Sequence, residues 1–122
     1  MANDIIDVHA HIVFDALLGM AGKHGPEAGR DDKDTPFFRV GGYTMKPLSY
    51  VGTVFNNLTL RLSELDRLHI DLQVLSPNPL TFLHGVEATI ATDFCRQHNA
   101  LMAETLAKAP DRLEGLAALP MQ

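Results

Sequence analysis

Three short apolar segments, separated by segments with helical periodicity, constrain the fold of this chain more than any other feature. The apolar segments cover residues 5–12, 70–75 and 116–119, and their length and composition are typical of strands buried on both faces. Between the last two, an apolar stripe at helical spacing spans residues 87–109 and stops at Pro110. Strands that alternate with helices favour a parallel sheet with right-handed crossovers. The sequence therefore predicts an α/β fold.

A first helix is expected to begin near Leu58, with an apolar face and a solvated face. Its apolar face comprises Leu58, Leu62, Leu65 and Leu68. Its solvated face comprises Arg61, Glu64 and Arg67. In the helix of residues 87–109, Cys95 and His98 lie on the apolar stripe. We therefore interpret Cys95 as a buried structural residue rather than a reactive thiol, and His98 as a core or interface residue rather than a metal ligand.

The segment between the first strand and the first helix divides into two parts. Residues 23–36 are polar, with glycine, proline and a run of charges, and predict a surface excursion. Residues 37–46 predict a small hairpin that turns at Gly41-Gly42 and ends at Pro47.

Composition limits the function classes. The chain has 122 residues, of which 46% are apolar, enough for one domain with a core. Its net charge of −5 disfavours nucleic acid as a partner. No segment has the apolar length of a membrane span or the pattern of a secretory signal. A single cysteine is typical of a reducing compartment, so we predict a cytoplasmic protein that binds neither nucleic acid nor membrane.

Two histidines at the end of the first strand carry the strongest functional signal. Alternation places His9 and His11 on the same face, roughly 6.5–7 Å apart along the strand. Such a pair can bind zinc, and also iron, nickel or copper. Chemistry in α/β folds collects at the carboxyl ends of parallel strands. Asp7 is expected on the opposite face, orienting neighbouring groups or capping the backbone. Alternatively, the histidines are only polar residues at a loop boundary.

Three motifs in order resemble one branch of a known superfamily. Residues 7–11, Asp-Val-His-Ala-His, are similar to the DxHxH of the first strand in the amidohydrolase superfamily. Residues 65–76 and residues 109–122 are similar to later segments of the amidohydrolase-related family typified by aminocarboxymuconate-semialdehyde decarboxylase. His69 replaces a glycine usual in that family, and histidine tolerates a left-handed backbone better than a branched residue does. The branch also holds γ-resorcylate and related aromatic decarboxylases, hydratases and hydrolases.

The resemblance implies the N-terminal portion of a TIM-type (β/α)8 barrel, with about three parallel strands, two main helices and a small antiparallel hairpin after the first strand. Residues 1–122 would then be a partial barrel domain with an insertion at about residues 13–57. A complete barrel takes about 250 residues. We therefore expect a truncated piece, a fragment, or an unusually short gene product. Three strands leave unpaired sheet edges, which predicts a homo-oligomer.

The resemblance also implies a divalent metal, zinc first, with His9 and His11 as ligands. The further ligands of the family, two histidines after the fifth and sixth strands and an aspartate at the eighth, would lie beyond three strands. No catalytic residue is therefore assigned, and the fragment is expected to be inactive alone. His24 and His84 sit in loops and could contribute, although nothing in their spacing selects them.

Two residues are candidates for substrate binding. Lys46 stands where the semialdehyde decarboxylase has an arginine that binds the substrate carboxylate. Lysine keeps the charge and loses the bidentate fork, and its alternative role is that of a solvated surface lysine. Asn78 follows the second strand and could hydrogen-bond a substrate or only shape its Pro-Asn-Pro turn. Gln122, at the end of the third predicted strand, has the same ambiguity.

The implied function is non-oxidative, metal-dependent decarboxylation of an unsaturated or aromatic carboxylic acid. Hydrolysis or hydration by the same family is the first alternative. A non-catalytic, oligomerising remnant is the second. A small doubly wound domain without metal ranks last, because its nucleotide-binding version should have a glycine-rich loop where residues 9–14 read His-Ala-His-Ile-Val-Phe.

Overall fold

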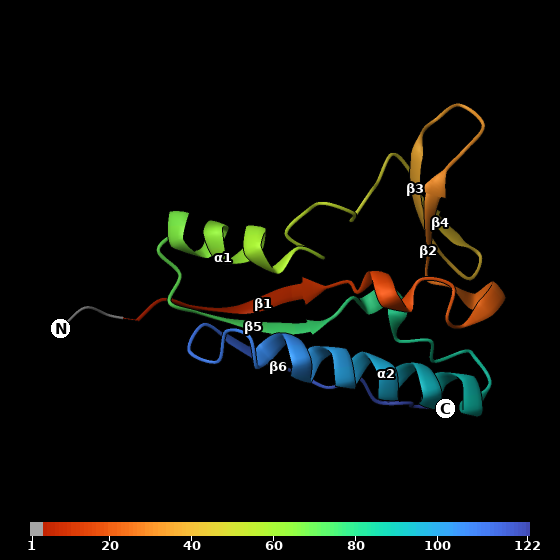
Figure 1. The fold of residues 1–122 in the computed structure, drawn as a ribbon. Helices are drawn as coiled ribbons and strands as arrows, with labels where there is room; N and C mark the ends of the chain where they lie inside the picture. The colour runs from red at the N-terminus through yellow and green to blue at the C-terminus, as the bar shows by residue number, and fades with distance from the viewer. Residues whose placement is uncertain (1–3) are drawn as a thin grey trace.

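The computed structural model describes residues 4–122, and this part of the chain forms two sheets of three strands each (Figure 1). The first sheet is parallel in the order β1-β5-β6. Its strands are β1 (Ile6–Ile12), β5 (Leu72–Pro77) and β6 (Leu113–Gly115). The second sheet is antiparallel, and it lies on the side toward which the arrowheads of β1 and β5 point (Figure 1). The prediction of an α/β fold with three parallel strands is confirmed.

Two helices, α1 (Leu58–Arg67) and α2 (Ala88–Leu106), pack on one face of the parallel sheet. Asn57 begins α1, because its side chain accepts the Leu60 N–H. An apolar core cluster lies between the helices and the sheet. It comprises Ile12, Leu65, Leu75, Met102, Ala109 and Leu113. Leu75 lies at its centre with no exposed surface, so the face of β5 that carries Leu75 is the helix-covered face.

The antiparallel sheet contains the predicted hairpin and one strand that was not predicted. Its strands are β2 (Glu27–Arg30), β3 (Pro36–Val40) and β4 (Tyr43–Met45). The turn between β3 and β4 lies at Gly41-Gly42, as expected. The prediction of a surface excursion over residues 23–36 was wrong where β2 pairs with β3. Gly29 permits this pairing, because a Cβ atom there would lie 3.0 Å from the ring of Phe37.

Gly25, just before β2, is required by its backbone conformation. Its φ is +85°, and a Cβ atom would lie 2.9 Å from the carbonyl oxygen of Arg39. We expect Gly25→Ala to lower the free energy of unfolding by about 2 kcal/mol or more, measured by urea denaturation. Gly42→Ala is the matched control in the same sheet, because a Cβ atom there meets nothing within 4 Å. Equal stabilities of the two variants would contradict this prediction.

The third strand lies three residues earlier than predicted. Residues 116–119 were expected to form it, whereas β6 covers Leu113–Gly115. Only the Leu116 N–H continues the pairing, to the Leu75 carbonyl. Beyond it, the side-chain amide of Asn99 on α2 donates to the Ala118 carbonyl at 3.0 Å and accepts its N–H at 2.7 Å. A helix side chain therefore satisfies the backbone that was expected to pair with β5.

The first strand is more exposed than its apolar sequence predicted. Ile6 is 52% exposed and Val8 is 75% exposed, because β1 forms one edge of the sheet. Ile12, at the carboxyl end of β1, lies in the core, and Ala10 packs against it. Leu68 was expected on the apolar face of the first helix, but it follows the last residue of α1 and is 49% exposed. His69 adopts a left-handed φ of +55°, a conformation that histidine tolerates better than a branched residue does.

The predicted core positions of α2 are confirmed. Cys95 and His98 are both buried, and burial raises the pKa of the Cys95 thiol. The helix ends at Leu106, three residues before the predicted end. Within residues 4–122, no helix combines the length and the apolar character that crossing a membrane requires.

Candidate metal centre

The two histidines of β1 lie side by side at its carboxyl half. The ring centroids of His9 and His11 are 5.0 Å apart, and the rings meet edge to face at 75°. His9 is exposed and His11 is half-buried. The expectation that both imidazoles occupy one face of the strand is confirmed.

The register of β1 against β5 identifies this face. Leu75 points into the helix-covered core, so the next residue, Ser76, points to the opposite face. His11 is paired with Ser76 in the register. The histidine pair therefore lies on the face of the parallel sheet that α1 and α2 do not cover, near the carboxyl ends of the strands.

Ser76 contacts His11 directly. The Ser76 Oγ lies 2.8 Å from the His11 Nδ1, and the Ser76 hydroxyl donates to the Ala10 carbonyl at 3.1 Å. No role in the site was assigned to Ser76 from the sequence. The signal that could have found it is its position on the adjacent parallel strand, which only the register reveals.

Asp7 lies on the other face from the histidines, as expected, although strict alternation would place residues 7, 9 and 11 on one face. The register shifts between Asp7 and Ala10, so that Asp7 is paired with Gln73 on the helix-covered face. The Asp7 carboxylate accepts the His9 backbone N–H at 3.0 Å and the Gln73 side-chain amide at 2.7 Å. The hydrogen bond from Gln73, followed by that from His9, lowers the pKa of Asp7. The carboxylate therefore holds the backbone of His9.

Arg61 supports the same strand from α1. Its guanidinium donates to the Gln73 side-chain oxygen at 2.7 Å and to the His11 carbonyl at 2.8 Å. The expectation that Arg61 faces water was wrong, because the residue is only 5% exposed. This burial lowers the pKa of its guanidinium. The helical spacing itself could have indicated burial, since position 61 lies three residues after Leu58 and four before Leu65.

The two candidate substrate-binding residues, Lys46 and Asn78, form their hydrogen bonds with residues other than the histidine pair. The Lys46 ammonium donates to the Asp31 carboxylate at 2.7 Å, a bond that lowers the pKa of Asp31 to about 2. Asn78 is 4% exposed. Its side chain accepts the Leu80 N–H and donates to the Tyr50 hydroxyl at 3.2 Å. Asn78 thereby begins a short 3-10 helix, which is the turn-shaping role weighed for it.

Two candidate metal-binding side chains, rather than a complete ligand set, come together at this site. Among residues 4–122, no three or more histidine, cysteine, aspartate or glutamate side chains gather in a ligand arrangement. His24 ends a 3-10 turn beside β2, and the ring of His84 stacks on Phe82 with centroids 5.5 Å apart. Gln122 donates to the Leu83 carbonyl. The adjacent imidazoles fit part of a coordination shell, since a catalytic zinc site usually has three protein ligands.

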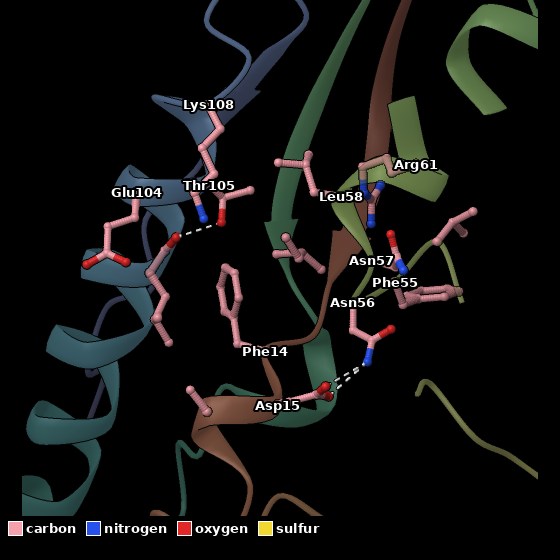
Figure 2. Close-up of a pocket in the computed structure, with 14 residues that line it drawn as sticks. Phe14, Asp15, Phe55, Asn56, Asn57, Leu58, Arg61, Glu104, Thr105 and Lys108 are labelled. Atoms are coloured by element: carbon pink, nitrogen blue, oxygen red, sulfur yellow. Dashed lines mark hydrogen bonds between the residues drawn. The ribbon is translucent and has the colours of Figure 1, made fainter. Parts of the chain in front are cut away.

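A pocket of about 250 Å3 lies elsewhere, between the helices (Figure 2). Figure 2 shows Glu104 and Thr105 of α2, with Lys108 just beyond its end, on one side and the start of α1 on the other. Asn56 closes one end by donating to both carboxylate oxygens of Asp15, at 2.9 and 3.0 Å. Neither histidine of the pair lines this pocket, so it is not the candidate metal centre.

Sequence comparison relates half of the chain to known enzymes. Over 63 residues, 52% of the chain, it is 40% identical to a gamma-resorcylate decarboxylase of Rhodococcus jostii (strain RHA1). Over the same length it is 36% identical to a 2-amino-3-carboxymuconate-6-semialdehyde decarboxylase of Dictyostelium discoideum. The chain resembles amidohydrolase-superfamily decarboxylases. The matched residues span 19% and 18% of these two decarboxylases. No protein-family model matches the chain.

Solved structures extend the resemblance to amidohydrolase-superfamily decarboxylases over nearly the whole chain. The IDCase of Metarhizium anisopliae matches 96% of the chain with a TM-score of 0.74 and 18% identity. A dihydroxybenzoic acid decarboxylase of Polaromonas sp. JS666 matches 98% with a TM-score of 0.60 and 25% identity. That structure holds manganese and the inhibitor 2-nitroresorcinol. The chain covers 35% and 31% of these two structures, about a third of their length.

Proposed function

We propose that this chain is the N-terminal part of a metal-dependent decarboxylase of the amidohydrolase superfamily, acting without an oxidant on an unsaturated or aromatic carboxylic acid. The observation that carries the proposal is the pair of adjacent imidazoles, His9 and His11, near the carboxyl end of β1. The similarity to a gamma-resorcylate decarboxylase and to a carboxymuconate-semialdehyde decarboxylase supports the reaction class.

His9 and His11 would hold a divalent metal, with zinc proposed first. Manganese in the Polaromonas decarboxylase supports a divalent ion. When bound, such an ion supplies positive charge that stabilises negative charge on substrate oxygens. The chain itself supplies the two ring nitrogens, while Asp7 and Arg61 hold the backbone of the two ligands from the helix-covered face.

Lys46 and Asn78 are the proposed substrate-binding residues. Lys46 carries the positive charge that a substrate carboxylate requires, and it would exchange its ion pair with Asp31 for that carboxylate. The Asn78 amide donates one hydrogen to the Tyr50 hydroxyl, and its second hydrogen would form a hydrogen bond to the substrate. Hydrolysis or hydration of a related substrate by the same site is the alternative reaction.

One observation favours a second candidate function, a non-catalytic oligomerising remnant. Only two metal-ligating side chains come together among the described residues, and two are fewer than a catalytic zinc site usually has. β1 and β6 are the two edges of the parallel sheet, and such edges can pair with another copy of the chain. We therefore propose that the 122-residue chain is inactive alone and forms a homo-oligomer in the cytoplasm.

Metal titration of the purified chain tests the ligand assignment. We expect one zinc or manganese ion to bind per histidine pair, as measured by isothermal titration calorimetry. His9→Ala/His11→Ala should weaken binding at least 100-fold, because both proposed nitrogen ligands are lost. His24→Ala/His84→Ala is the matched control and should bind as the unaltered chain does. Unchanged metal affinity in His9→Ala/His11→Ala would overturn the proposal.

A further inference from the structure

The Ser76 hydroxyl has two close neighbours and one hydrogen to share between them. The Ala10 carbonyl oxygen, at 3.1 Å, can only accept a hydrogen bond. The His11 Nδ1, at 2.8 Å, donates or accepts according to its tautomer. If the Ser76 hydrogen points to Ala10, both contacts become hydrogen bonds only when His11 Nδ1 carries a proton.

We propose that Ser76 is a positioning residue, which holds His11 as the Nδ1–H tautomer and leaves its Nε2 lone pair available for the metal. This inference rests on the proposed function for its purpose, but the tautomer itself is a property of the metal-free chain. A second hydrogen bond that fixes the tautomer and ring orientation is how proteins orient a histidine ligand.

The surroundings hold Ser76 and His11 in the required positions. Ser76 is fixed by β5, which pairs with β1 in parallel register. The His11 carbonyl is held from the other side of the sheet by the buried guanidinium of Arg61. His11 is therefore anchored through both its ring and its backbone.

His9 differs from His11 in how it is held. Its backbone N–H is bound by Asp7. For its ring, the contact found among residues 4–122 is with the ring of His11, and the residue is exposed. His11 is the preset ligand of the pair, and His9 has the freedom to adjust to the ion.

Nitrogen-15 NMR of the metal-free chain, labelled at histidine, tests the tautomer directly. At a pH well above the ordinary histidine pKa, we expect His11 to show a protonated Nδ1 and a bare Nε2. Ser76→Ala should shift His11 toward the Nε2–H tautomer, while Ser76→Thr, which keeps the hydroxyl, should retain Nδ1–H. Ser63→Ala is the control, because Ser63 is exposed on α1. Finding Nε2–H in the unaltered chain, or no change in Ser76→Ala, would overturn the assignment.

Zinc titration of the same variants tests the positioning role. We expect Ser76→Ala to weaken zinc binding about 10- to 100-fold and Ser76→Thr to restore most of it. Equal zinc affinity of Ser76→Ala and the unaltered chain would overturn the positioning role. If the unaltered chain binds no zinc, the proposed function fails, and the NMR comparison still decides the tautomer. Circular dichroism of each variant confirms that it folds.

Discussion

Arg61→Ala is expected to lower the free energy of unfolding by about 3–5 kcal/mol, because it removes two hydrogen bonds from a charged donor and leaves their acceptors unpaired. Those acceptors are the Gln73 side-chain oxygen and the His11 carbonyl. The loss also removes the buried aliphatic stem of an arginine that is only 5% exposed. Urea denaturation followed by circular dichroism measures the difference.

Arg67→Ala is the matched control for this prediction. Arg67 lies on the same helix and pairs with Glu64 at 2.8 Å, but its side chain is 65% exposed. Exposed ion pairs contribute little, so we expect a change below about 1 kcal/mol. Similar losses for the two variants would mean that Arg61 does not brace β1. Arg61→Lys should recover only part of the stability, because lysine lacks the planar fork that reaches both acceptors.

The second large effect concerns His98 and pH. His98 is 2% exposed, and its ring meets Phe14 edge to face at 5.1 Å. Among residues 4–122, neither ring nitrogen finds a hydrogen-bond partner. Burial lowers the pKa of His98 from 6.5 to about 4. Between these values the unfolded chain binds more protons than the folded chain, so stability rises with pH there. The contribution of neutral, buried His98 to the free energy of unfolding is complete above pH 6.5 and is about 3 kcal/mol smaller at pH 4.

Denaturation of the unaltered chain and of His98→Leu at several pH values between 4 and 7 measures this effect. Carboxylates and other histidines titrate equally in both proteins, so the difference between the two curves reports on His98. We expect the unaltered chain to lose about 3 kcal/mol more than His98→Leu on going from pH 7 to pH 4. Parallel curves would show that His98 is not buried in its neutral form.

The parts of the structure that were predictable are those governed by local periodicity. The opening strand and both helices were predicted from the spacing of apolar residues. The shared face of His9 and His11 follows because two residues complete one period of a strand. The hairpin was visible from Gly41-Gly42 between two short runs rich in aromatic and β-branched residues.

The parts that were missed depend on contacts between distant residues. Arg61 is buried because Gln73 and the His11 carbonyl, 12 and 50 residues away, accept its hydrogen bonds. The last strand ends early because Asn99 binds Ala118, 19 residues later. Ser76 and His11 are 65 residues apart. In each case the partner became apparent only once the strands and helices had been placed in space.

The shifted register between Asp7 and Ala10 has a consequence for interpreting Asp-x-His-x-His motifs. By strict parity, residues 7, 9 and 11 would all project the same way, and a carboxylate would stand in line with two imidazoles as a third donor. The irregularity turns the Asp7 carboxylate to the helix-covered face of the sheet, where it accepts the His9 backbone N–H instead of facing the proposed metal ion. Deleting Val8 would remove the extra residue of β1 and leave the carboxylate directly before His9, still on the helix-covered face.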